Sequence, residues 1–359
     1  MARKICILII FILVFSCTST AYGASGDVSI VLTGDLLCDR SFQQAVGNGK
    51  TFDFDSVLKY VKPYISRADF AVGNLETCVS SSNKISYYQG KKEYCPMLNA
   101  PKSFLRSLKK TGFDGLILAN NHCCDTGAKG ILETVASVNN AGFKHTGLYT
   151  SSKSNHYFTL SKNGIKIGFV AYTFHFNNKH RSLKKQQQDV MLSKFDEARI
   201  KKDIAACKKA GANFIIAYDH CGDEFTYKTN SLQWQHMKTL ARCGADFIVG
   251  SHPHVLQKIG SVRMTSKTVP FVYSLGNFTG NMSYKKTKES AFITLTLTKR
   301  NNGKVRIKNT RYTPVYMAKD FDGKPLALLP GGYKCKYKST QLKIDRHFQH
   351  ARDILNGKV

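Results

Sequence analysis

Short runs of β-branched and aromatic residues alternate with amphipathic segments through most of this 359-residue chain, and each run ends in a polar loop. The runs have the length and composition of buried strands, whereas the segments between them repeat their apolar residues with a helical period. This alternation predicts an α/β fold. The expected strands are residues 27–33, 70–73, 115–119, 165–172, 213–218, 246–250 and 269–274, and the expected helices are residues 55–65, 102–110, 130–141, 195–209 and 232–243.

The pattern changes after residue 290, where two alternating apolar and polar segments, 291–299 and 304–316, are joined by an Asn-Asn-Gly hairpin signal. We therefore expect antiparallel C-terminal strands, followed by a helix around residues 345–355. The sequence contains no internal repeat, no Pro- or Ser-rich linker and no sharp break in composition. These features favour one domain at residues 24–320, with a basic C-terminal extension at residues 321–359.

The N-terminus has the features of an export signal. Two basic residues precede an apolar run of 11 residues at positions 5–15, and the small residues Ala21 and Gly23 stand where a signal peptidase requires them. The run is too short to cross a bilayer as a helix, which takes about 20 residues. Residues 1–23 are thus predicted to be a signal peptide, and the mature chain to be periplasmic, extracellular or attached to the cell envelope. Lipidation at Cys17, which would associate the chain with a membrane without spanning it, is the alternative.

The composition is strongly basic, with 53 Lys and Arg against 24 Asp and Glu and a formal net charge of +29. Loss of the signal peptide leaves 51 basic and 24 acidic residues, a net charge of +27. Such an excess indicates an anionic partner. An exported chain without a nucleic-acid-reading motif rarely meets nucleic acid, so an anionic polymer or phosphoester of the cell envelope is the preferred partner. Alternatively, the lysine-rich runs at residues 179–185, 284–288 and 334–343 are only solvated surface.

Nine cysteines follow the predicted signal peptide, an odd number, so at least one of them is unpaired or pairs with another molecule. A bridge between Cys78 and Cys95 is the preferred pairing. Five cysteines lie within a few residues of the candidate metal ligands: Cys38, Cys78, Cys123, Cys124 and Cys221. They could act as thiolate ligands, but we prefer the interpretation that they are small buried apolar residues or disulfide partners.

Polar side chains gather in six loops that each follow a predicted strand. Because ligand-binding residues of open α/β sheets lie beyond the carboxyl ends of the strands, these side chains are expected to meet. Their carboxylate, amide and imidazole groups are ligands for divalent cations. The six loops are Gly34-Asp35 with Arg40, Gly73-Asn74-Leu75-Glu76, Asn120-Asn121-His122 with Asp125 and Gly127, His220 with Gly222 and Glu224, Gly250-Ser251-His252-Pro253-His254, and Ser274-Leu275-Gly276-Asn277-Phe278.

Each loop also has a local interpretation. Gly34-Asp35 is a common turn, and Asn120 and Asn121 are good caps for a following helix. His252 and His254 would share one face on a strand, which suits one metal ion, but two histidines can also pack there by chance. The occurrence of all these motifs at strand ends, in order, favours a metal centre over a series of coincidences.

The order of the motifs resembles the CapA/PgsA family, which is named for poly-γ-glutamate capsule synthesis and has a calcineurin-like metallophosphoesterase fold. The resemblance covers residues 27–280. It implies a four-layer α-β-β-α sandwich of mixed sheets with a dinuclear metal site at one edge. By the same resemblance, the metal ligands would be Asp35, Asn74 or Glu76, Asn121, His220, His252 and His254. His122 would be the catalytic acid with Asp125 beside it, Arg40 would hold an anionic substrate, and Glu224 and Asn277 would support the site.

The chain also departs from these patterns. It has Gly34-Asp35 where metallophosphoesterases have Asp-x-His, and Asn74-Leu75-Glu76 where they have Gly-Asp, so the resemblance implies one or two divalent ions of Mn, Fe, Zn or Mg. Cys221 stands where the capsule family usually has an aromatic residue, and Thr279-Gly280-Asn281 replaces a more acidic segment. These later changes are expected to alter substrate contacts more than metal ligands.

Two functions remain open at this point. In the first, the protein is an exported, metal-dependent hydrolase or transferase of capsule or poly-γ-glutamate biosynthesis that uses a metal-bound hydroxide. In the second, it is a non-catalytic carrier or export component that binds an anionic polymer such as poly-γ-glutamate, working with other envelope biosynthesis proteins.

Overall fold

The computed structural model describes residues 26–48, 50–81 and 96–359. The predicted signal peptide, Cys17 and Cys95 lie outside these residues, so the export signal, the lipidation and the Cys78–Cys95 bridge stay predictions. In the described part of the chain, no helix combines the length and apolar character needed to cross a membrane.

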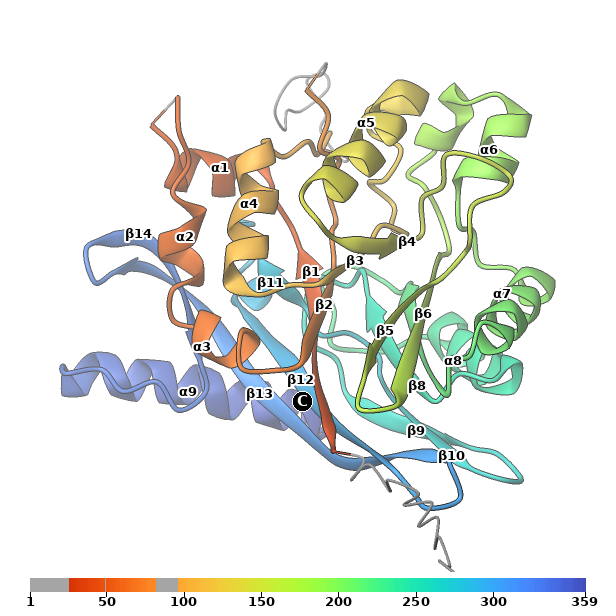
Figure 1. The fold of residues 1–359 in the computed structure, drawn as a ribbon. Coiled ribbons are helices and arrows are strands. Elements are labelled where there is room, and N and C mark those ends of the chain that lie inside the picture. Colours follow the sequence, from red (N-terminus) through yellow and green to blue (C-terminus); the bar gives the residue numbers. More distant parts are fainter. Residues whose placement is uncertain (1–25, 49, 82–95) are drawn as a thin grey trace, which may run out of the picture.

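Two mixed β-sheets lie face to face at the centre of the molecule (Figure 1). The first has the order β14-β13-β12-β1-β2-β3-β4, with β11 also paired to β1, and the second has the order β5-β6-β7-β8-β10-β9. The strands of the first sheet are β1 (Val28–Leu36), β2 (Phe70–Asn74), β3 (Gly115–Ile117), β4 (Lys144–Thr146), β11 (Asn277–Thr279), β12 (Glu289–Lys299), β13 (Val305–Phe321) and β14 (Lys324–Pro330). Those of the second are β5 (Phe158–Lys162), β6 (Ile165–Thr173), β7 (Phe214–His220), β8 (Phe247–Ser251), β9 (Ile259–Arg263) and β10 (Thr268–Val272).

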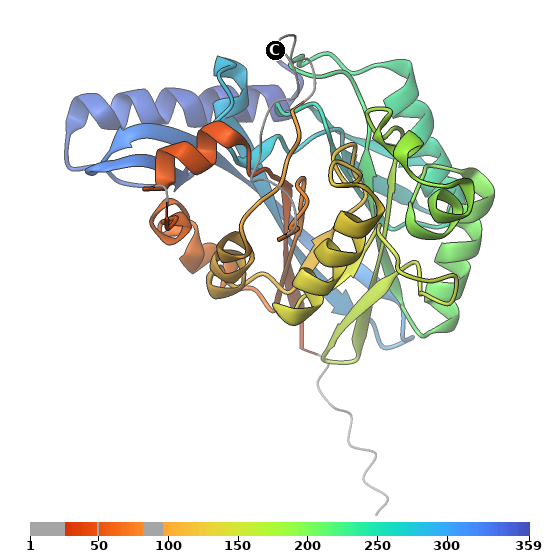
Figure 2. The same cartoon turned by 90° about the horizontal axis from the view of Figure 1, so that it is seen from above.

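Helices cover the outer faces of both sheets (Figures 1 and 2). On the first sheet these are α1 (Arg40–Val46), α2 (Phe54–Leu58), α3 (Lys62–Ile65), α4 (Lys102–Thr111) and α5 (Gly127–Asn140). On the second they are α7 (Glu197–Lys209) and α8 (Ser231–Cys243). The remaining helical elements are η1 (Lys179–Ser182), α6 (Lys185–Met191), η2 (Lys285–Lys288) and α9 (Lys338–Leu355). The predicted four-layer α-β-β-α sandwich is therefore confirmed.

The alternation of side chains along the strands explains the three layers of core. In β1, Ile30 and Leu32 point into the core between the sheets, whereas Val31 points outward to the helices of the first sheet. The outer core of the second sheet is built in the same way, because Val170 of β6 and Ile204 of α7 share a cluster. These strands are apolar on both faces, which is what a sheet covered on both sides requires.

The expected antiparallel C-terminal strands are present. β12 pairs with β1 and β13, and β13 pairs with β14, in each case antiparallel. β13 runs through residue 320, where the sequence predicted the domain to end, and β14, from the predicted C-terminal extension, forms the edge of the first sheet. α9 packs Ile344 and Phe348 against this edge and adds Ala351 to the core between the sheets.

Two helix predictions need correction. The segment expected to be one helix at residues 55–65 is two short helices, α2 and α3, because Pro63 cannot donate the main-chain hydrogen bond that a continuous helix needs at that position. The C-terminal helix begins at Lys338 rather than near residue 345, since its first four residues, Lys-Ser-Thr-Gln, are polar and show no apolar period.

Candidate metal centre

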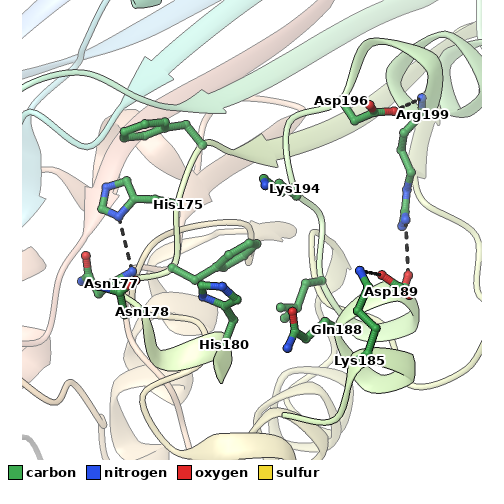
Figure 3. A pocket seen from close by; sticks show the side chains of 13 residues that line it. His175, Asn177, Asn178, His180, Lys185, Gln188, Asp189, Lys194, Asp196 and Arg199 are labelled. Atoms are coloured by element: carbon green, nitrogen blue, oxygen red, sulfur yellow. Dashed lines mark hydrogen bonds and ion pairs between the residues drawn. The ribbon is translucent and has the colours of Figure 1, made fainter. Parts of the chain in front are cut away.

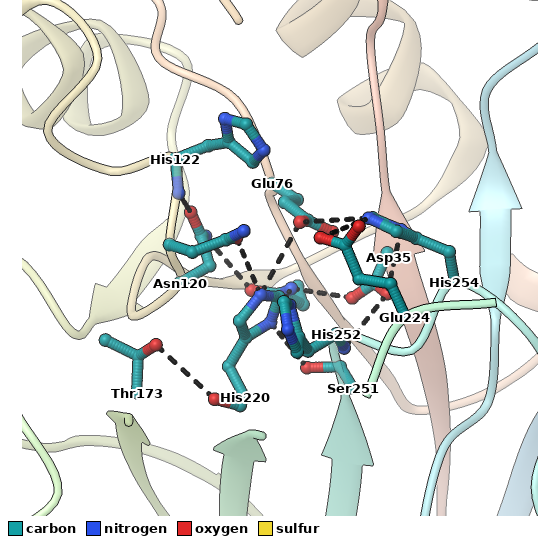
Figure 4. Close-up of polar contacts among 12 residues, drawn as sticks. Asp35, Glu76, Asn120, His122, Thr173, His220, Glu224, Ser251, His252 and His254 are labelled. Atoms are coloured by element: carbon teal, nitrogen blue, oxygen red, sulfur yellow. Dashed lines mark hydrogen bonds and ion pairs between the residues drawn. The ribbon is translucent and has the colours of Figure 1, made fainter. Parts of the chain in front are cut away.

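The carboxyl ends of strands from both sheets meet at one edge of the sandwich and bring five candidate ligands together (Figure 4). Asp35 lies near the end of β1, Glu76 follows β2 by two residues, and His220 is the last residue of β7. His252 and His254 follow β8. All five side chains are buried. The predicted loops therefore do converge, and they bring these five side chains together.

The five residues form two groups of metal-ligating atoms that share Glu76. One group is Glu76, His220 and His252, the other is Asp35, Glu76 and His254, and the ligand atoms in each lie within 4.8 Å of one another. Glu76 Oε1 is 3.5 Å from His220 Nε2 and 3.8 Å from His254 Nε2. Asp35 Oδ2 is 4.0 Å from His254 Nδ1. Such an arrangement suits one ion in each group, with the Glu76 carboxylate between them.

The surroundings of Glu76 show whether the candidate ligands are suited to binding a cation. Its side chain is fully buried, and within the described chain neither carboxylate oxygen has a hydrogen-bond partner. A buried carboxylate without donors is costly, and burial raises the pKa of Glu76 accordingly. His252 Nδ1 likewise lacks a hydrogen-bond partner among the described residues. A divalent cation would satisfy these atoms, so the donor set fits a metal centre.

The backbone is forced into unusual conformations to present the two histidines. His252 has φ of +97° and His254 has φ of +60°, in a region that side-chain-bearing residues rarely adopt. The two residues lie beyond the end of β8, so the possibility that they share one face of a strand does not apply, and both rings reach the centre. Close approach of the chain also requires Gly34, where a Cβ atom would lie 2.1 Å from Gly276 O. This approach lets the Asp35 N–H donate to Gly276 O at 3.0 Å.

Burial gives two of the candidate ligands, His220 and His252, the neutral state that metal binding needs. It lowers the pKa of His220 to about 3 and that of His252 well below its ordinary value, so both imidazoles are neutral at neutral pH. Burial, with the nearby Glu76 charge, raises the pKa of Asp35 to about 6. Burial also disfavours protonated His254, but the carboxylates of Glu76, Asp35 and Glu224 outweigh it and raise the pKa of His254.

Asn74, Asn120 and Asn121 make different contacts in the centre. Asn74 donates from Nδ2 to Asp35 Oδ1 at 2.7 Å and its Oδ1 accepts from Asn120, so Asn74 orients Asp35, and Glu76 is the better ligand of the predicted pair. Asn121 Oδ1 lies 2.9 Å from His220 Nε2, at the edge of the first ligand group. Neither Asn120 nor Asn121 caps α5, whose first residue is Gly127.

His122 and Asp125 form a buried pair beside the ligands. His122 Nδ1 is 2.7 Å from Asp125 Oδ2, and the same oxygen accepts the main-chain N–H of Leu98 at 2.7 Å. Burial disfavours the imidazolium, but the charge and hydrogen bond of Asp125, with the charge of Glu76, raise the pKa of His122 to about 9. His122 therefore holds a proton at neutral pH, as a general acid must.

The remaining predicted residues lie at the rim or away from the centre. Asn277 Oδ1 is 2.9 Å from His254 Nδ1, and Glu224, whose side chain is 40% exposed, is 4.0 Å from His254 Nε2. Arg40 is the exposed first residue of α1 and makes no hydrogen bond or ion pair with the centre in the part of the chain that the structure describes. Its predicted role in substrate binding stays a prediction.

Two residues of the centre were missed by sequence reasoning. His175 Nε2 lies 3.3 Å from His252 Nε2, and Ser251 Oγ lies 3.0 Å from His220 Nδ1. His175 follows β6, a predicted strand, and the position of an imidazole just beyond a strand end was the signal that could have identified it. Ser251 was named as part of its loop but was given no role in the centre, because a serine after a strand carries no distinctive signal.

The cysteines near the centre are not among its ligands. Cys38, Cys78, Cys123 and Cys124 are buried and belong to no candidate metal group within the described residues. Cys221 lies in a separate buried cluster with Asp219 and His236, in which His236 Nδ1 is 3.1 Å from both carboxylate oxygens of Asp219. This cluster joins β7 to α8.

Comparison with solved structures finds phosphoesterases and nucleotidases. The calcineurin-like phosphoesterase YfkN from Bacillus subtilis aligns with a TM-score of 0.49 at 15% identity, covering 90% of this chain and 97% of that one. The NAD nucleotidase NadN of Haemophilus influenzae aligns with a TM-score of 0.47 at 12% identity, covering 91% of this chain and 60% of that one.

Comparison with curated proteins finds two relatives. The capsule biosynthesis protein CapA of Bacillus anthracis is 31% identical over 283 residues, which are 77% of this chain. This match spans 65% of that relative's length. The PGA biosynthesis protein CapA of Bacillus subtilis (strain 168) is 29% identical over 338 residues, covering 93% of this chain and 82% of the relative. The model of the bacterial capsule synthesis protein PGA_cap matches residues 29–282, which contain the whole metal centre, and the chain therefore belongs to this family.

Proposed function

We propose that the protein is an exported, metal-dependent hydrolase or transferase that acts on an anionic polymer, or on an ester linkage of that polymer, during capsule biosynthesis. The observation that carries this proposal is the Glu76 carboxylate, which is fully buried, lacks hydrogen-bond partners in the described chain, and faces the nitrogens of His220 and His254. A purely structural role gives no reason to bury a carboxylate in this way.

The residues that would hold the metal are the two groups that share Glu76. His220 and His252 with Glu76 would hold one ion, and Asp35 and His254 with Glu76 a second. When bound, divalent ions make water a stronger nucleophile and neutralise negative charge that develops on the group under attack. Asn74 and Asn277 keep Asp35 and His254 in place through hydrogen bonds of 2.7 and 2.9 Å.

The proton for the leaving group would come from His122. Its Nδ1 is held by Asp125 at 2.7 Å, which leaves Nε2 as the nitrogen that can give a proton to substrate. Asp125 does not act on substrate itself: it positions the imidazole and keeps it protonated. Arg40, exposed on α1, would contact a more distant anionic group of a long substrate.

The substrate class follows from charge and from the relatives. The Bacillus subtilis relative is described as a PGA biosynthesis protein, and we propose poly-γ-glutamate or a similar polyanion for this chain as well. Its net charge of +29 supports an anionic partner. The substrate would be met outside the cytoplasm, in line with the predicted export signal, and together with other envelope biosynthesis proteins.

The decisive experiment combines metal content with turnover. We expect the purified mature protein to contain at least one divalent ion per chain and to hydrolyse a phosphoester or γ-glutamyl model substrate. Glu76→Gln should lose bound metal and reduce turnover by about 100-fold, because it removes the charged ligand that both groups share. Glu197→Gln, which changes an exposed carboxylate on α7, is the matched control and should behave as wild type.

Two results would contradict the proposal. Full metal content and turnover in the Glu76→Gln protein would exclude Glu76 as a shared ligand. Stoichiometric metal in a wild-type protein that turns over neither substrate but binds polyglutamate would instead favour the carrier.

A further inference from the structure

A cavity of about 660 Å³ lies beside the metal centre, and the ring of His175 stands between them (Figure 3). Its walls come from the loop after β6, from η1 and α6, and from the segment that leads into α7. His175 belongs to both sites, because it lines the cavity while its Nε2 lies 3.3 Å from His252 Nε2. The volume falls within the range of ligand pockets, about 300–1,000 Å³. The cavity therefore lies next to the metal centre, and His175 is the residue that they share.

Among the basic side chains that line the cavity, one has no ion-pair partner within the described residues. Lys185 Nζ pairs with Asp189 Oδ1 at 2.6 Å, and Arg199 Nε lies 3.5 Å from Asp203 Oδ2. Lys194, which lines the same cavity, forms no ion pair or side-chain hydrogen bond within the described residues. Asp196 also lines the cavity, where its Oδ1 accepts the Arg199 main-chain N–H at 2.8 Å and caps α7. The cavity therefore offers one ammonium group without an ion-pair partner to a ligand.

Lys194 is held at a defined place beside the metal centre. Its backbone pairs with Thr173, the last residue of β6 and two residues before His175. On either side of Lys194, Thr173 N donates to Ser193 O at 3.0 Å and Phe195 N donates to Thr173 O at 2.9 Å. Figure 3 shows the Lys194 side chain between the loop that carries His175 and the start of α7. The charge is thus carried on a segment anchored to the sheet.

The uncharged lining is suited to amide groups. Asn177 and Asn178 are consecutive residues in the left-handed conformation, with φ of +48° and +60°, and both line the cavity. Their side-chain amides make no hydrogen bond within the described chain, so both their donors and their acceptors are open to a ligand. Phe174 and Phe176 add apolar surface to the same wall.

These features favour a singly charged carboxylate over a phosphate group. Phosphate is typically bound by several cations or by the two-pronged face of an arginine. The Arg199 guanidinium is already occupied, since it contacts Asp203, the Asp189 carbonyl at 3.5 Å and His156 Nε2 at 3.2 Å. One free ammonium beside two free amides matches a carboxylate attached to an amide-linked chain.

We propose that this cavity binds an acidic, amide-linked segment of the polymer next to the bond under attack, with Lys194 holding a carboxylate of that segment. The inference rests on the proposed function of the metal centre for the identity of the neighbouring reaction, but binding in the cavity is measurable without turnover. Lys194 acts as a specificity-determining residue, and His175 lies between the bound segment and the metal ligands.

The test measures binding of a γ-linked glutamate pentamer to the full mature chain by calorimetry, with and without added Mn²⁺. Lys194→Met should weaken binding about tenfold, the loss expected for one charge-assisted contact of about 1.4 kcal/mol. Lys194→Arg should retain most of the affinity. Lys202→Met, at an exposed position on α7 outside the cavity, is the matched control and should bind as wild type does. The γ-linked isoglutamine pentamer, in which every α-carboxylate is replaced by an amide, should bind weakly to every variant.

Each outcome decides a separate point. Equal affinity of wild type and Lys194→Met for the glutamate pentamer would overturn the inference, and so would a Lys194-dependent preference for inorganic triphosphate over that pentamer. Lys194-dependent pentamer binding in a protein without turnover would leave the inference standing while the proposed enzymatic function fails. Conversely, Glu76→Gln could abolish turnover while Lys194→Met leaves the KM unchanged. The proposed enzymatic function would then stand and the inference about the cavity would fail.

Discussion

Neighbouring histidines of the metal centre have opposite protonation states, and their immediate contacts explain the difference. Burial, together with the charges of His254 and His122, lowers the pKa of His220 to about 3, because its carboxylate neighbours do not outweigh these effects. His122 is equally buried, yet Asp125 at 2.7 Å contributes to raising its pKa to about 9. A neutral imidazole suits a metal ligand and a protonated one suits a general acid.

The contact between His122 and Asp125 leads to a prediction about pH. Asp125→Asn removes the charge that favours the imidazolium, so the pKa of His122 should fall from about 9 to about 6.5 or below. A raised pKa in the folded state stabilises the protein fully below about pH 6.5, and this stabilisation is lost as the pH rises through about 9. Wild type should therefore lose thermal stability between these values, and Asp125→Asn should lose less.

The measurement is a chemical-shift titration of the His122 ring in metal-free protein, together with thermal unfolding from pH 6 to pH 10. Asp203→Asn, which removes a carboxylate beside His156 on the far side of the cavity, serves as the control and should leave the His122 titration unchanged. An unchanged His122 titration in Asp125→Asn would show that Asp125 does not set its protonation state.

At the level of elements, α9 is fastened to the first sheet by one buried carboxylate. Glu289, the first residue of β12, accepts from His347 Nδ1 at 2.6 Å and from His350 Nδ1 at 2.5 Å. His347 also stacks on Tyr316 of β13 with 3.8 Å between ring centroids. Because the two histidines are three residues apart on α9, they face the same carboxylate from successive positions of one helix face.

This clamp predicts a local loss of stability. Glu289→Gln keeps the shape of the side chain but offers one acceptor oxygen to two imidazole donors, and should cost about 1–3 kcal/mol. The loss should appear as faster amide hydrogen exchange in α9, with little change in α4 or α5 on the other face of the sheet. Asp353→Asn, on the exposed side of α9, is the control. Uniform exchange changes through all helices would mean that α9 does not open as a separate unit.

The elements themselves were predictable to different degrees. Long apolar strands such as β1 and β7 were identified because their composition and polar ends are distinctive. β4 was not identified, since three residues are too few to show a period. The break between α2 and α3 depends on Pro63, a local signal that the longer apolar period of the segment obscured.

For the whole molecule, the excess of basic residues predicts salt-sensitive binding to polyanions. Charges that lie on the surface act through solvent, so added salt screens them within about 10 Å at 0.1 M. Affinity for long-chain polyglutamate should therefore fall about tenfold between 50 and 300 mM NaCl. Binding to neutral dextran, measured in the same way, should be negligible at both concentrations. Affinity for polyglutamate that does not change with salt would contradict an electrostatic origin.

The sequence by itself determined the α/β class, the position of most of the longer strands along the chain and the polar loops that carry the candidate metal ligands. These properties depend on local periodicity and on polar residues that follow apolar runs, both of which are written in consecutive residues. His254 and Asp35, for example, could be named because each follows a strand end.

Only the tertiary structure decided which of these residues meet and with what chemistry. Glu76 meets histidines that come from the other sheet. Asn74 supports Asp35 within the first sheet and His175 contacts His252 within the second, in both cases between residues far apart in the chain. The packing of the sheets also decides which carboxylate is buried without a partner and which lysine is left unpaired beside the metal centre. The protonation and pairing of these groups depend on burial and on distances between remote segments of the chain. Neither quantity is a property of a short stretch of sequence.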